Sequence, residues 1–91
     1  MSDVNVVKID VVEILGQKGV IRNKHVQIDT VVNWFPSHEQ GDVKDAIDEL
    51  LAEPDSPVVR KRQNTIRLKG ASEAREYLRD NGRDVPFRLR D

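Results

Sequence analysis

The densest chemistry in the sequence is a run of positive charge between residues 57 and 70. The stretch PVVRKRQNTIRLKG holds five lysine and arginine side chains and no carboxylate. Guanidinium and ammonium groups bind phosphate oxygens through charge-assisted hydrogen bonds. The pattern therefore favours binding to a polyanion such as the DNA backbone. The residues that carry this charge are Arg60, Lys61, Arg62, Arg67 and Lys69.

The charge of the whole chain is close to balanced, but its distribution is not. The formal net charge is −1 at pH 7. Residues 1–56 hold five basic and eleven acidic side chains, whereas residues 57–91 hold ten basic and five acidic ones. Such a chain can present one face to a polyanion and keep the other away from it. The same division also suits head-to-tail pairing with a second copy of the chain.

Residues suited to catalysis or metal binding are few. The chain has no cysteine and two histidines, His25 and His38, and no motif places a nucleophile beside either of them. A metal site needs several convergent ligands, which two histidines do not supply. The sequence also lacks a glycine-rich phosphate loop. We therefore expect a protein that is not an enzyme and that needs no metal or other cofactor.

Length and hydropathy predict one cytoplasmic domain. A chain of 91 residues has room for a single core. No apolar run approaches the roughly 20 residues that span a bilayer. Asp3 and Asp10 stand where a secretory signal carries positive charge, so we expect neither export nor a membrane partner. The domain is predicted over residues 1–82, with a flexible C-terminal tail over residues 83–91.

Two helices and a short strand are predicted in the first part of the chain. Residues 4–19 place apolar side chains at helical spacing, although their many β-branched residues also suit a strand. Residues 20–22 are long enough for a short strand. Asn23 is suited to cap the next helix, which ends at Pro36.

The third predicted helix has the clearest amphipathic pattern. Its start is open between two caps, Ser37 with Gln40 as a capping box, and Asp42. The prolines of the PDSP segment at 54–57 end it. A fourth amphipathic helix is predicted over residues 71–82. The apolar stripe of the third helix comprises Val43, Ala46, Ile47, Leu50 and Leu51.

The basic stretch itself is predicted to form a β-hairpin. Two β-prone runs flank Gln63-Asn64, a turn in which asparagine tolerates a positive φ. With a two-residue loop, Arg60 lies directly opposite Arg67. A phosphate between these two guanidinium groups would turn their repulsion into attraction. The cationic face of the hairpin then comprises Arg60, Arg62, Arg67 and Lys69, with Lys61 near the tip.

The predicted order is helix, strand, helix, helix, strand, strand, helix, in an α+β chain. This order resembles the winged helix-turn-helix family, with NKHVQIDTVVNWFPSHEQGDVKDAIDELLAE as the helix-turn-helix and PVVRKRQNTIRLKG as the wing. The resemblance covers residues 4–81. The family usually binds duplex DNA, with its third helix in the major groove and its wing on an adjacent groove or the backbone. The resemblance thus implies a DNA-binding protein similar to transcription regulators.

The third predicted helix departs from this family pattern because its exposed face is acidic. From Asp42 to Glu53 the exposed side chains carry five negative charges and one positive charge. Carboxylates in direct contact with a DNA groove are poorly screened, which opposes insertion of this face. We expect the hairpin to be the main contact, and the starts of the second and third helices to be secondary contacts. The secondary residues are Arg22, Lys24, Ser37, His38, Gln40 and Lys44.

Two other interpretations of the same charges stay open. An acidic helix face and a basic hairpin also suit a protein-interaction module that binds a protein partner or forms a homodimer. Cations on an exposed hairpin can also simply guard a sheet edge against aggregation.

Overall fold

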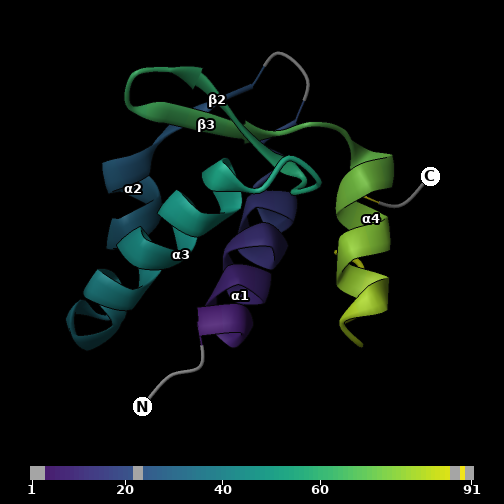
Figure 1. Ribbon diagram of the computed structural model, residues 1–91, viewed down its shortest axis with the longest axis horizontal. Helices are drawn as coiled ribbons and strands as arrows, with labels where there is room; N and C mark the ends of the chain where they lie inside the picture. The colour runs from purple at the N-terminus through teal and green to yellow at the C-terminus, as the bar shows by residue number, and fades with distance from the viewer. Residues whose placement is uncertain (1–3, 22–23, 87–88, 90–91) are drawn as a thin grey trace.

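The computed structural model describes residues 4–21, 24–86 and 89, which form four α helices and a three-stranded antiparallel sheet (Figure 1). The predicted α+β class is therefore confirmed, and the arrangement is compatible with a small winged-helix-like fold. The elements are α1 (Val4–Gln17), β1 (Val26–Gln27), α2 (Ile28–Asn33), the 3₁₀ turn η1 (Ser37–Glu39), α3 (Gln40–Ala52), β2 (Val58–Arg62), β3 (Thr65–Leu68) and α4 (Ala71–Asp80).

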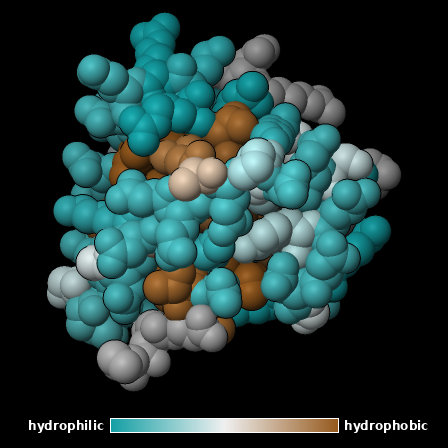
Figure 2. Space-filling model, viewed as in Figure 1, coloured by the Kyte–Doolittle hydropathy of each residue, from teal (hydrophilic) through white to brown (hydrophobic). Residues whose placement is uncertain are grey.

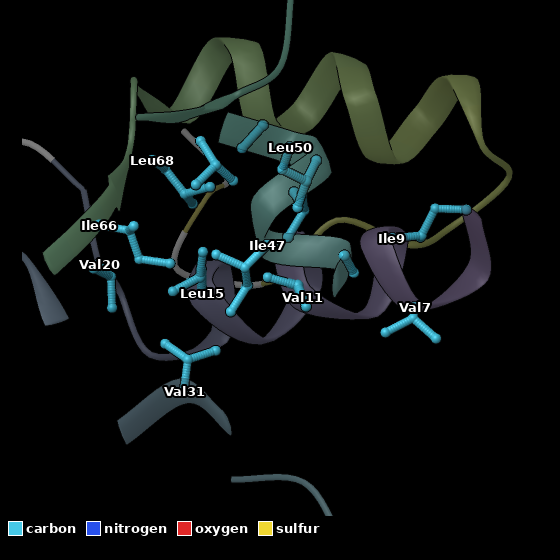
Figure 3. Packing of buried hydrophobic residues seen from close by; sticks show 14 of the residues in the cluster. Val7, Ile9, Val11, Leu15, Val20, Val31, Ile47, Leu50, Ile66 and Leu68 are labelled. Atoms are coloured by element: carbon cyan, nitrogen blue, oxygen red, sulfur yellow. The ribbon is translucent and has the colours of Figure 1, made fainter. Parts of the chain in front are cut away.

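The core lies between the helices and the inner face of the sheet. Helix α1 is central, because it packs against both α3 and α4. Its Val11, Val12 and Leu15 are fully buried. Figure 3 shows side chains of α1 and α3 meeting around Ile47. Four members of the predicted α3 stripe are fully buried and Leu51 is partly buried; the four are Val43, Ala46, Ile47 and Leu50.

Strand β3 is the middle strand, in the order β1-β3-β2. Both neighbours run antiparallel to it, and its Ile66 and Leu68 are fully buried. Ile21 adds an isolated parallel bridge to Leu68. The sheet therefore depends on one short apolar strand. The pairs across it are Val26 with Ile66, Gln27 with Thr65, Val58 with Leu68, Val59 with Arg67, Arg60 with Ile66 and Arg62 with Thr65.

The register of the hairpin differs from the sequence prediction. Arg62 does face its predicted partner Thr65. Beyond that pair, a β-bulge inserts Lys61 as an extra residue in β2, and every later pair shifts by one residue. Arg60 therefore pairs with Ile66 and does not lie opposite Arg67. Both the predicted facing pair of arginines and the predicted single cationic face are wrong, because Arg60 is on the other face of the sheet from Arg62 and Arg67.

Burial of Val58 explains the bulge. In the predicted register Val58 would lie on the cationic outer face, whereas in the structure it pairs with Leu68 and is only 3% exposed. Burying a valine side chain stabilises the fold by roughly 1.5–3 kcal/mol. An extra residue at the polar end of the strand allows this burial while Arg62 still closes the turn.

The second helix also begins later than the sequence predicts. Of Val20 and Ile21, the described residues of the predicted first strand, only Ile21 makes a bridge, and β1 lies further along the chain. Helix α2 begins at Ile28, whose N–H donates to the carbonyl oxygen of Asn64 at 2.8 Å. Val26 and Gln27, which local propensity assigns to the helix, therefore pair with β3 as strand β1. Arg22 and Asn23, the predicted cap, lie outside the described residues.

Neither predicted cap begins α3. Glu39 occupies the N-cap position and makes no side-chain capping hydrogen bond. Ser37 lies one turn earlier in η1, and Asp42 lies inside the first turn of α3. Gln40 instead donates from Nε2 to the carbonyl oxygen of Phe35 at 3.2 Å, which ties the start of α3 to the end of the α2 segment.

The described part of the C-terminal segment packs against α1. Leu89 is fully buried, and Val85 is also buried. A Cβ atom added to Gly16 would approach Leu89 Cδ1 to 2.5 Å, so the glycine permits this close packing. Arg83 forms an ion pair with Asp10 at 2.9 Å. These contacts join residues 83–86 and 89 to the domain, in the region where the sequence predicts a flexible tail.

The substitution Leu89→Ala tests this packing. Removing a fully buried leucine side chain is expected to lower the free energy of unfolding by about 2–4 kcal/mol, because it leaves a cavity against α1. Urea unfolding followed by circular dichroism measures the change. Arg79→Ala, at an exposed position on α4, is the control and should change stability by less than about 0.5 kcal/mol. An effect of Leu89→Ala as small as that of the control would contradict the burial of Leu89.

An ion pair between the buried Lys8 and the exposed Glu53 links α1 to the end of α3. The ammonium group of Lys8, which is 7% exposed as a residue, donates to Glu53 Oε1. The hydrogen bond to Glu53 raises the pKa of Lys8. Burial raises the pKa of the nearby Tyr77 phenol. A group whose pKa rises on folding contributes stability that is present below its ordinary pKa and is lost as the pH rises through the folded value.

Substitutions of the pair should therefore change the alkaline stability. Lys8→Met keeps the aliphatic volume and removes the charge, so wild type should lose stability more steeply than this variant above about pH 10.5. Because the Lys8 charge also lowers the pKa of Tyr77, the comparison is repeated in a Tyr77→Phe background, where the difference reports on Lys8. Glu53→Gln leaves the ammonium group without its carboxylate and should cost about 1–2 kcal/mol at pH 7, because Glu53 is partly exposed. Urea unfolding from pH 7 to 11 measures both effects, and parallel pH profiles for wild type and Lys8→Met would contradict the first.

Candidate nucleic-acid interface

The sheet unites two segments of the chain that contain no carboxylate. Residues 57–70 form β2, the turn and β3, and residues 24–27 lead into and form β1. Neither segment contains aspartate or glutamate. They are distant in sequence, and pairing of β1 with β3 places them side by side. We call these two segments together the basic sheet; its cations are Lys24, Arg60, Lys61, Arg62, Arg67 and Lys69.

Two cations stand free at the tip of the hairpin. The side chains of Lys61 and Arg62 are exposed, and neither makes a hydrogen bond or an ion pair within residues 4–21, 24–86 and 89. The backbone N–H of Arg62 donates to Thr65 Oγ1 at 3.1 Å, which braces the turn beneath them. The tip therefore offers two ammonium or guanidinium groups whose hydrogen-bonding capacity is unused.

The other three hairpin cations are held by backbone carbonyl groups. Arg60 Nη1 donates to the carbonyl oxygen of Gln63 at 2.7 Å, and Arg67 Nη1 donates to that of Leu68 at 3.0 Å. Lys69 Nζ donates to the carbonyl oxygen of Pro54 at 3.0 Å. Carbonyl groups orient these side chains without cancelling their charge, and each guanidinium group keeps further N–H donors. In the described part of the chain no carboxylate forms an ion pair with any of the five.

The sheet register adds one polar residue, Gln27, that the sequence prediction missed, beside the predicted pair of Arg62 and Thr65. Gln27, Thr65 and Arg62 face one another across the three strands, so their side chains share one face of the sheet. An amide, a hydroxyl and a guanidinium group in one row can all donate to phosphate oxygens. The position of Gln27 depends on a two-residue strand, which leaves no periodic pattern in the sequence.

The start of α3 is a separate region from the basic sheet. Figure 1 shows α3 running toward the sheet, so that its first turn and η1 lie at the end remote from β2 and β3. Ser37 and His38 are exposed there, whereas the Gln40 amide is engaged with Phe35. Lys44 is exposed on α3 itself. Of the predicted secondary residues, Lys24 alone is part of the basic sheet, and Arg22 lies outside the described residues.

The exposed face of α3 is acidic, as the sequence indicated. Asp45, Asp48 and Glu49 are exposed along it, with Lys44 as the one cation on the helix. Five carboxylates and one ammonium group between Asp42 and Glu53 oppose contact with phosphates. The structure therefore separates its charges, with cations on the sheet and carboxylates on the helix.

Comparisons with protein-family models, with curated proteins and with solved structures found no match to this chain. No helix in the described ranges is long and apolar enough to cross a membrane. Those same ranges contain no group of three or more histidine, cysteine, aspartate or glutamate residues placed to hold a metal ion.

Proposed function

We propose that the protein binds duplex DNA without acting as an enzyme, mainly through phosphate contacts of the basic sheet. The observation that carries this proposal is the assembly of two carboxylate-free segments into one sheet, with the carboxylates of α3 on a different element. Duplex DNA presents one negative charge per roughly 1.7 Å of its axis, which attracts a cluster of cations that no carboxylate neutralises. The resemblance to winged helix-turn-helix proteins supports the same partner and a role in transcription regulation in the cytoplasm.

The number of phosphates that the hairpin cations neutralise sets the expected strength of binding. If four of the hairpin cations each neutralised one phosphate, the slope of log K against log salt would be near −3.6. Affinity would then fall on the order of 100-fold between 50 and 200 mM salt. Contacts of this kind position a protein on the backbone and carry little base specificity.

The acidic face of α3 defines how the protein would approach DNA. Insertion of Asp45, Asp48 and Glu49 into a groove would bring carboxylates against phosphates, so α3 does not serve as a deep recognition helix. Ser37 and His38 lie at the opposite end of α3 from the sheet (Figure 1), so we do not include them in this contact. The basic sheet is then the principal contact and α3 faces away from the duplex.

Removing the two free cations at the tip tests the proposal. Lys61→Ala with Arg62→Ala lowers the net charge by two, and Arg79→Glu, on exposed α4, lowers it by the same amount away from the sheet. Binding to a random-sequence duplex is measured by fluorescence anisotropy between 50 and 200 mM salt. The tip variant should reduce the magnitude of the salt slope by about 1.8 units, because two phosphate contacts are lost, whereas Arg79→Glu should keep the wild-type slope.

The same titrations separate DNA binding from the alternative of a protein-interaction module. Such a module predicts no binding of wild type to random duplex even at 50 mM salt. If wild type and the tip variant bound the duplex with equal affinity and equal salt slope, the proposal that the basic sheet binds DNA would be wrong. Urea unfolding of each variant checks that the fold is retained, since exposed substitutions usually change stability by less than about 0.5 kcal/mol.

A further inference from the structure

Strand β2 is an edge strand whose alternate backbone groups point away from the sheet. On β3, the N–H of Leu68 donates to Val20 O at 2.9 Å, on the β1 side of the strand. Alternate residues of a strand turn their backbone groups to the same side, so Ile66 also faces β1. Val58 and Arg60, the partners of these two residues in β2, consequently turn their N–H and C=O groups to the outer edge.

One of these outward groups is already capped inside the chain. The N–H of Val58 donates to Ser56 Oγ at 3.1 Å. The C=O of Val58 and both the N–H and the C=O of Arg60 are left directed at the outer edge. The bulge at Lys61 then interrupts the edge. The edge therefore offers an acceptor on Val58, followed by a donor and an acceptor on Arg60. One added strand could form three hydrogen bonds with these groups.

An open groove runs beside this edge, between β2 and the C-terminal half of α3. Its volume is about 580 Å³, within the range of roughly 300–1,000 Å³ that is usual for ligand sites. Figure 2 shows hydrophobic surface exposed between the hairpin and α3. The apolar residues that line the groove are Leu51, Ala52, Pro54, Val58 and Val59.

The two walls of the groove carry opposite charges. Arg60 and Lys69 line it on the sheet side, and Lys69 is held at one end by its hydrogen bond to Pro54 O. Asp48 lines it on the α3 side. Glu53 also lies there but is paired with Lys8. A complementary occupant carries an acidic side chain toward Arg60, a basic side chain toward Asp48 and an apolar side chain between them.

We propose that this groove is a docking site for a short extended segment of a partner protein, which adds as a strand to the edge of β2. Two independent features support it: the outward backbone groups of Val58 and Arg60, and the apolar, charge-divided groove beside them. Main-chain hydrogen bonds supply the binding, and the side-chain pocket supplies the selectivity. The site shares Arg60 and Lys69 with the basic sheet, but it does not require Lys61 or Arg62 at the tip, so variants of the tip test the two sites separately.

The probe for this site is a synthetic, end-capped peptide of sequence Gly-Lys-Val-Glu-Val-Gly. Titration of ¹⁵N-labelled protein should shift the amide signals of residues 58–60 and 51–52 and give a Kd in the high micromolar range, about 10⁻⁴–10⁻³ M. In a series of control peptides, each carries a single N-methyl group at a different central residue and therefore lacks one backbone N–H donor. At least one of them should bind about tenfold more weakly, because a buried acceptor on β2 is then left unpaired.

Two substitutions of one residue separate the backbone contact from the charge. Arg60→Pro removes the outward N–H, and a proline is tolerated on an edge strand where its missing donor faced solvent. Arg60→Ala keeps the N–H and removes the charge. Peptide affinity should fall about tenfold or more in Arg60→Pro and only about threefold in Arg60→Ala. The tip variant with Lys61→Ala and Arg62→Ala should bind the peptide as wild type does.

The outcomes that would overturn the docking site are distinct from those that bear on DNA. Absence of amide shifts up to about 2 mM peptide would overturn it, as would equal affinity of Arg60→Pro and Arg60→Ala. Shifts confined to the tip of the hairpin would show a charge contact without strand addition, which also contradicts the proposal. If Arg60→Pro unfolds, the N-methylated peptides are tested on the wild-type protein instead. Binding of all of them as tight as that of the unmodified peptide would exclude main-chain pairing.

Discussion

Strand β3 pairs with β1 on one side and with β2 on the other, and the arrangement of charge depends on that double pairing. Its fully buried Ile66 and Leu68 fix the strand against the core. Because β3 is held there, the two carboxylate-free segments at 24–27 and 57–70 have to lie side by side. The proposed polyanion site would therefore be a consequence of core packing, since the cations contribute little to stability themselves.

The same core packing places the acidic helix next to the basic sheet, and their opposite charges meet at the groove between them. Helix α3 uses its apolar stripe against α1 and turns Asp45, Asp48 and Glu49 outward. The C-terminal half of α3 approaches β2, and the space between them is the charge-divided groove. One scaffold therefore carries two overlapping surfaces: the basic sheet, which we propose binds phosphates, and the groove beside β2, which we propose binds an extended peptide.

Sequence patterns predicted what depends on local periodicity and missed what depends on long-range pairing. The α3 stripe was visible because helical spacing is a property of the sequence itself, and the five hairpin cations were visible as charge. The register of the hairpin was not visible in the sequence, because it depends on packing against the core. Burial of Val58 in that core requires the bulge at Lys61. Likewise β1 and the role of Gln27 follow from pairing with β3 and leave no local signal.

Mapping of amide chemical shifts during titration with a random-sequence duplex at low salt tests the central claim most directly. The separation of charge predicts that perturbed amides cluster at residues 24–27 and 57–70, while those of α3 between Asp45 and Glu49 stay unchanged. Perturbations concentrated on that face of α3, with the hairpin unaffected, would contradict the assignment of phosphate binding to the basic sheet.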